Sequence, residues 1–351
     1  MRGESGKLMK NIIKVVFVII GTLIGAGFAS GQEMYIFFFS YGVNGIYGII
    51  ISASLMGFII YKTLKIINKY NIKNYRDFLD LTINIKSKKK YFNLKNIINI
   101  IINIFILITF FIMIAGFGAY FQQELNINHY IGSIVLAIMC FVVFLNSIKG
   151  LVKINQFLIP ILIILILIIG LINIKDINIF DISNLINRTN NSNWFVSSIL
   201  YCSYNSILLI PALITLRNFL NNKKQIFLIS VFSGIIIILL SIILFLLLIK
   251  IDINISSLEM PIVYVVSKMH IFLKYIYGFV IISSIFTTSI SLGISFLQNV
   301  SNNKKSYTQI AVIMCITSVF VSQFGFANLV NLLYPIFGYL GIAQILTMIS
   351  K

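Results

Sequence analysis

The sequence is poor in charge, and above all in acidic residues. Of its 351 residues only 10% are charged and nine are Asp or Glu, whereas 59% are apolar and the mean hydropathy is +1.00. A soluble domain carries about 25% charged residues. A soluble enzyme and a nucleic-acid-binding protein are therefore excluded as classes, and we expect the chain to lie in a lipid bilayer.

Cysteine and histidine are also scarce. Cys140, Cys202 and Cys315 lie inside apolar stretches without paired spacing, and His129 and His270 stand alone near the ends of such stretches. These positions favour neither a disulfide framework nor a zinc site. The chain also lacks a nucleophile elbow and a phosphate-binding loop, so we expect neither an enzymatic activity nor an organic cofactor.

In place of charge, the chain has long apolar runs. A membrane helix needs about 20 apolar residues to cross about 30 Å of hydrocarbon. Ten such windows cover residues 12–39, 42–61, 97–120, 131–145, 155–172, 194–216, 226–249, 271–297, 308–322 and 329–349. The prediction is an all-α integral membrane bundle of about ten transmembrane helices, forming one membrane domain over residues 1–351.

The first window lacks a small-residue cleavage pattern and is interpreted as a membrane helix, not a signal peptide.

Positive charge is distributed unevenly between the apolar runs. If the helices alternate in direction from a cytoplasmic N-terminus, 22 of the 27 Lys and Arg residues lie on the cytoplasmic side and five on the other. This asymmetry follows the positive-inside rule, so both termini are predicted to be cytoplasmic. The basic segment 62–95 is interpreted as a solvated loop, with binding of anionic lipid head groups as the alternative.

Two of the ten helices are predicted to be broken. The first contains four glycines within eleven residues, from Gly21 to Gly31, and each glycine costs a helix about 1 kcal/mol relative to alanine. The sixth contains the polar run 201–205, followed by Pro211. Because these helices are five apart, the pattern predicts two inverted five-helix repeats, over residues 12–172 and 194–349.

The glycine-rich break indicates a binding site. Unwound backbone is tolerated in a bilayer only where it is buried in protein or lines a wet cavity. Half-helix ends present N–H groups to an anion and C=O groups to a cation, which suits a small zwitterion with a coupling ion. The alternative is close helix packing, because Gly21/Gly25 and Gly27/Gly31 each have small-xxx-small spacing.

The eighth helix carries a stripe of hydroxyl groups. Ser284, Thr288, Ser291 and Ser295 follow helical spacing, with Thr287 beside them. Together with free carbonyl groups, these oxygens are ligands that a sodium ion accepts. The alternative is that the hydroxyls bond to carbonyls of the preceding turn or pack closely against a neighbouring helix.

Glu33 is the one carboxylate within a predicted membrane segment. Intramembrane carboxylates are costly and usually functional, so Glu33 could carry a proton, bind a substrate amine, or pair with a hydroxyl or with Gln32. If the first helix ends early, Glu33 would instead lie in a wet vestibule. The side chains expected to face the same cavity from the sixth helix are Tyr201, Ser203, Tyr204 and Asn205.

Three motifs, GTLIGAGFASGQE (21–33), SYN (203–205) and YPIFGYLG (334–341), resemble those of the YkvI-type bacterial membrane proteins. That family is similar to the amino acid–polyamine–organocation transporters, which share the LeuT fold. The resemblance implies a secondary transporter of a small amino acid or related metabolite in the bacterial cytoplasmic membrane, working by alternating access and coupled to Na⁺ or H⁺.

The resemblance also implies roles for individual residues. The substrate carboxylate would meet the backbone amides of Gly25, Ala26 and Gly27. The ligands implied for a sodium ion are the carbonyls of Gly21 and Ile24 and the hydroxyls of Ser284, Thr287 and Thr288. The chain differs from that fold in having no helices beyond ten and in its Gln32–Glu33 pair, so the coupling ion stays open.

Two other functions are consistent with the sequence. One is a ligand-sensing subunit, similar to a subunit of spore germinant receptors, which would bind an amino acid and signal through partner proteins. The other is a membrane scaffold without a ligand. The expected partners are a small-molecule substrate and the lipid bilayer; the sequence identifies no protein partner.

Overall fold

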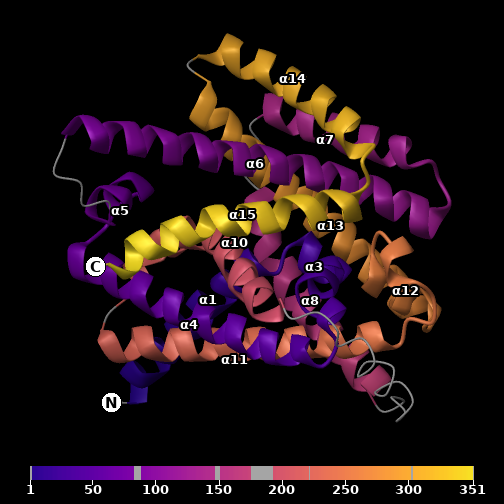
Figure 1. Cartoon of the computed structure of the whole chain (residues 1–351), viewed down its shortest axis with the longest axis horizontal. Helices are drawn as coiled ribbons and strands as arrows, with labels where there is room; N and C mark the ends of the chain where they lie inside the picture. The colour runs from indigo at the N-terminus through magenta and orange to yellow at the C-terminus, as the bar shows by residue number, and fades with distance from the viewer. Residues whose placement is uncertain are drawn as a thin grey trace.

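The computed structural model describes residues 2–82, 88–146, 151–174, 193–220, 222–301 and 303–350. Within these ranges the chain is almost entirely helical and contains no strand, so the predicted all-α class is confirmed. The helices form one bundle, and both termini lie at the same end of it (Figure 1).

The first half of the chain forms α1 (Arg2–Leu23), α2 (Ala26–Ser30), α3 (Gln32–Phe37), the 3₁₀ helix η1 (Phe39–Tyr41), α4 (Asn44–Tyr70), α5 (Tyr75–Thr82), α6 (Lys88–Leu125), α7 (His129–Asn146) and α8 (Leu151–Ile174). The second half forms α10 (Trp194–Thr215), η2 (Arg217–Phe219), α11 (Lys223–Ile249), η3 (Ile255–Ser257), α12 (Pro261–Ser267), α13 (Ile271–Val300), α14 (Lys304–Ser322) and α15 (Phe326–Ile349).

The apolar windows of the sequence correspond to these helices. Among the described residues, seven helices are long and apolar enough to cross a membrane, namely α4, α6, α10, α11, α13, α14 and α15. Shorter apolar helices over 11–23, 129–145 and 158–173 lie in the three remaining windows. Each window therefore contains a helix, whereas ten complete membrane crossings and the inverted repeat stay predictions.

The sixth predicted helix is not broken, which corrects the sequence prediction. α10 continues through 201–205 and Pro211 without interruption. The Ser203 hydroxyl and the Asn205 amide each donate to the carbonyl four residues earlier, at 2.7 and 3.0 Å. Polar side chains that bond to the preceding turn leave the backbone ladder intact. The proposed inverted repeat therefore loses one of its two supporting observations.

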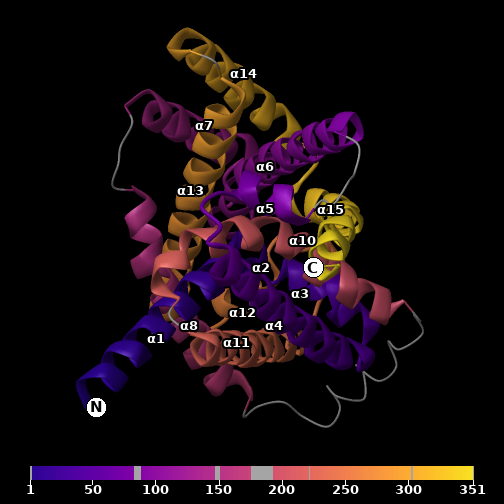
Figure 2. The same cartoon turned by 90° about the vertical axis from the view of Figure 1, so that its left-hand side faces the viewer.

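α10 lies near the centre of the bundle with α2 and α3, surrounded by α4, α6, α11, α13 and α15 (Figure 2). It packs against α15 and α4, and more weakly against α1. The approach of α15 depends on two glycines of its motif. A Cβ on Gly338 would lie 2.8 Å from the Leu200 carbonyl oxygen, and one on Gly341 would overlap the Ser203 carbonyl. The 334–341 motif thus has a packing role.

We expect Gly341→Ala to destabilise the protein, because its new methyl group would force α15 away from α10. Overpacking of this kind costs about 1–3 kcal/mol. Gly234→Ala on α11 is the matched control, since a Cβ there meets only the Ala53 carbonyl oxygen at 3.6 Å. Thermal unfolding of the two purified variants should show a lower melting temperature for Gly341→Ala alone; equal melting temperatures would contradict the packing role.

Candidate functional site

The first predicted membrane helix is interrupted at two points. α1 ends at Leu23 and α2 begins at Ala26, while Gly31 separates α2 from α3. Gly25 is extended, with φ −89° and ψ −174°, and Gly31 lies in the left-handed region with φ +85°. The first interruption confirms the predicted break. The second was not predicted, although Gly31 is the last glycine of the same motif.

The first break releases backbone groups from the helical ladder. The Gly25 N–H donates to the Leu23 carbonyl at 3.1 Å, instead of to the Gly21 carbonyl that a continuous helix would use. No backbone donor in the described ranges is recorded for the Ile24 carbonyl. No side chain caps the first turn of α2, where N–H groups lack partners within the helix. The break therefore leaves both backbone carbonyl and amide groups available to bind a ligand.

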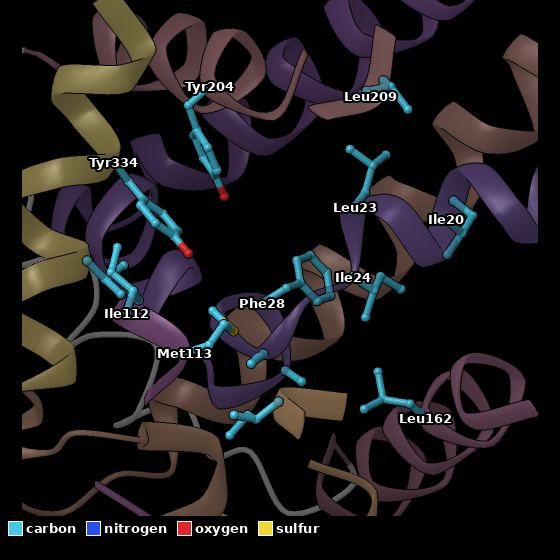
Figure 3. Packing of buried hydrophobic residues seen from close by; sticks show 14 of the residues in the cluster. Ile20, Leu23, Ile24, Phe28, Ile112, Met113, Leu162, Tyr204, Leu209 and Tyr334 are labelled. Carbon is cyan, nitrogen blue, oxygen red and sulfur yellow. The ribbon is translucent and has the colours of Figure 1, made fainter. Parts of the chain in front are cut away.

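Gly25 is surrounded by open space. A Cβ built on it would meet no atom within 4 Å, and its φ is one that any residue adopts. Gly21 is different, because a Cβ there would overlap Ile159 of α8. The helix-packing alternative thus explains Gly21 but not Gly25. Tyr204 of α10 and Tyr334 of α15 direct their hydroxyl groups toward this part of helix one (Figure 3).

Glu33 folds back over α2. The side chain is only 4% exposed, and a Cβ on Gly27 would overlap its carboxylate. The bend at Gly31 redirects α3 and permits this arrangement, while the Tyr204 hydroxyl donates a hydrogen bond to Glu33 Oε2. Because Glu33 is buried, the wet-vestibule alternative is wrong.

The buried carboxylate of Glu33 lacks a cationic partner among the described residues. No Lys, Arg or His among the residues that the structure describes forms an ion pair with Glu33; the pairs present are Lys268–Asp252 and Lys274–Glu124. Burying an unpaired charge is costly. A buried Glu33 is therefore expected to carry a proton or, when it is ionised, to face the cationic group of a ligand.

The four residues predicted from the sixth helix are all buried but have different surroundings. Of the four, Tyr204 forms a hydrogen bond with Glu33. Tyr201 packs edge-on against Phe37 and Phe38, with ring centroids 5.4 and 4.8 Å apart. Ser203 and Asn205 bond to carbonyls of their own helix. The structure thus brings Tyr204 into the site and gives the other three local or packing contacts.

Tyr334 is a site residue that the sequence did not single out. Its ring lies 4.7 Å from that of Tyr204, centroid to centroid, and it is buried. The signal was its place as the first residue of the 334–341 motif. The sequence motif alone does not specify which helix the Tyr334 side chain faces.

Some hydroxyl groups of the α13 stripe bond to carbonyls of their own helix, while others stay available as ligands of a sodium ion. Thr287 donates to the Ser283 carbonyl at 3.0 Å, and Ser291 donates to the Thr287 carbonyl at 2.9 Å. Thr287 also donates to the Ser284 carbonyl at 3.2 Å, whereas the hydroxyl groups of Ser284 and Thr288 form no side-chain hydrogen bond within the described ranges. α13 contacts α2, where the Tyr277 hydroxyl donates to the Ala29 carbonyl at 2.6 Å. The sodium site stays a prediction.

Comparison with known proteins identifies two relatives of nearly equal length. No protein-family model matches the chain. The uncharacterized membrane protein YkvI of Bacillus subtilis (strain 168) is 27% identical over 344 residues, covering 96% of this chain and 95% of its own. The uncharacterized protein YyaD of the same strain is 26% identical over 332 residues, covering 94% of each. The resemblance to YkvI-type membrane proteins is therefore confirmed.

Among solved structures, the manganese transporter of Eremococcus coleocola aligns over 98% of this chain and 71% of its own. The aligned residues are 13% identical and the TM-score is 0.45, a similarity too low to establish a shared fold. Neither of the two relatives from Bacillus subtilis is named as an enzyme.

We expect Tyr204→Phe to destabilise the protein by about 1–3 kcal/mol, because it leaves a buried carboxyl group without its hydrogen-bond partner. Tyr334→Phe is the control, since its hydroxyl bonds to no residue that the structure describes. Thermal unfolding measures both. In a Glu33→Ala background the cost of Tyr204→Phe should disappear; an equal cost in both backgrounds would show that the Tyr204 hydroxyl acts elsewhere.

Proposed function

We propose that the protein is an ion-coupled secondary transporter that moves a small amino acid or related metabolite by alternating access. The observation that supports this most strongly is the break at Ile24–Gly25. It combines released backbone groups, open space beside Gly25 and a buried Glu33 that forms no ion pair within the described ranges, inside a helix bundle suited to a membrane. Irregular backbone at this depth is typical of a ligand-lined cavity.

The chemistry of the break suits a zwitterion. The N–H groups at the start of α2, at Ala26 and Gly27, favour a carboxylate, and Glu33 favours an amine. The Gly25 amide, which was also predicted to bind the carboxylate, is engaged with the Leu23 carbonyl, so it contributes less than its two neighbours. The hydroxyl groups of Tyr204 and Tyr334 lie where they could orient the ligand.

Two coupling ions are compatible with the site. A sodium ion would use the carbonyls of Gly21 and Ile24 with the hydroxyls of Ser284 and Thr288, all of them oxygen donors. A proton would reside on Glu33. We propose that the transporter lies in the bacterial cytoplasmic membrane with both termini in the cytoplasm, because Lys and Arg are concentrated in the segments assigned to that side.

We expect Gly25→Leu to abolish uptake while the protein stays folded, because the position of its Cβ is open and the longer side chain would enter the space proposed for the ligand. Gly25→Ala adds only a methyl group to the same space and serves as the control. Uptake of radiolabelled amino acids into proteoliposomes, with a sodium or a proton gradient, measures the effect. Wild-type uptake by Gly25→Leu would place the ligand elsewhere, and ligand binding by the wild type without uptake would favour a sensing subunit.

We expect Glu33→Gln to separate the two roles of the carboxylate. If Glu33 carries the coupling proton, the variant should still exchange substrate across the membrane but should no longer respond to a pH gradient. If Glu33 binds the substrate amine, affinity should fall by about tenfold or more at every pH, as expected for loss of a buried charged hydrogen bond. Unchanged uptake with unchanged pH dependence would exclude both roles.

A further inference from the structure

A polar pocket of about 420 Å³ lies apart from the helix-one site. It is formed where three connections meet: the turn between α6 and α7, the segment that precedes α12, and the link between α14 and α15. These connections lie at the end of the bundle away from the termini (Figure 1). We call it the outer pocket. Its lining includes His129, Tyr130, Glu259, Phe324 and Asn328.

Glu259 gives the outer pocket a negative charge. One carboxylate oxygen accepts a hydrogen bond from the Ala327 N–H at 2.6 Å, at the start of α15. The other lies where Gly325 leaves room, since a Cβ on that glycine would be 2.7 Å away. No Lys or Arg in the described ranges pairs with Glu259 or lines the pocket.

His129 adds an unsatisfied polar atom. Its Nε2 is buried and has no hydrogen-bond partner among the described residues. The ring lies against Gly118, where a Cβ would be 2.9 Å from the imidazole Cδ2. The backbone carbonyl of Ala115 interacts with the same imidazole. In the tautomer of the neutral imidazole that carries its proton on Nδ1, Nε2 is an acceptor.

The other side chains that line the outer pocket also favour a ligand with N–H donors and a positive charge. The Asn328 amide group donates to the Phe324 carbonyl at 3.0 Å, which leaves its oxygen as an acceptor. Tyr130 and Phe324 provide aromatic rings, whose faces attract cations. A pocket with one carboxylate, several acceptors and no described cation repels anions and suits a ligand rich in N–H donors.

We propose that the outer pocket binds a small organic cation through an ammonium or guanidinium group. Glu259 supplies the charge-assisted hydrogen bond, while His129 Nε2 and the Asn328 oxygen accept from the remaining N–H groups. This binding is independent of the transport proposal, since it involves none of the residues at helix one.

The outer pocket is connected to helix one through four consecutive residues, 259–262. Met260, next to Glu259, is held by Gln123 of α6, which accepts from its N–H and donates to its carbonyl, both at 3.0 Å. Ile262 packs on the bend of helix one, because a Cβ on Gly31 would overlap it. The outer pocket and the bend that precedes Glu33 are thus neighbours along one short segment of chain.

Thermal unfolding of the purified full-length protein tests the proposal, with ethylammonium and agmatine as probes and acetate as the anionic comparison. We expect saturable stabilisation by the two cations and none by acetate. Glu259→Gln keeps an acceptor for the Ala327 N–H but loses the charge, so the half-saturating concentration should rise by about tenfold or more. Asp252→Asn, which changes an exposed carboxylate paired with Lys268, is the matched control and should bind as the wild type does.

Variants of the two sites separate this proposal from the transport site. Glu33→Gln should keep the stabilisation by ethylammonium, because Glu33 does not line the outer pocket. If the stabilisation survives in Glu259→Gln and disappears in Glu33→Gln, the cation binds at helix one and the outer-pocket proposal is overturned while the transport proposal stands. Absence of stabilisation in the wild type would overturn it as well.

Discussion

The structure depends on one constraint, the need of backbone groups released inside a bilayer to find partners. At Ile24–Gly25 the ladder of helix one stops, and the Gly25 N–H turns to Leu23 instead of Gly21. In hydrocarbon each unpaired group would cost several kcal/mol. Leu23 and Ile24 beside the break are buried within the bundle, and the released polar groups give the break the character of a binding site.

The four glycines of the motif meet this constraint in different ways. Gly21 permits close packing with α8, and Gly25 leaves space open. Gly27 makes room for the carboxylate of Glu33, and Gly31 supplies the left-handed bend that turns Glu33 back over it. A single glycine-rich segment thus provides a close helix contact, an open position beside the backbone and the placement of a buried acid.

Sequence periodicity predicted much of this fold for a physical reason. A bilayer imposes helix length and apolarity, so the windows match helices, and glycine density marked the break in helix one. Polarity was a poorer guide in α10, because Ser203 and Asn205 satisfy their hydrogen bonds within the helix. The contact of Tyr204 with Glu33 joins residues far apart in the chain, and no local pattern specifies it.

Labelling of a cysteine placed at position 25 tests the central claim most directly, that helix one opens onto a ligand-accessible space. Cys140, Cys202 and Cys315, all buried, would first be replaced by alanine or serine. We expect a water-soluble thiol reagent to modify Gly25→Cys, and a bound amino acid substrate to slow the modification. A folded protein in which this cysteine is never modified, with or without candidate substrates and coupling ions, would contradict the claim.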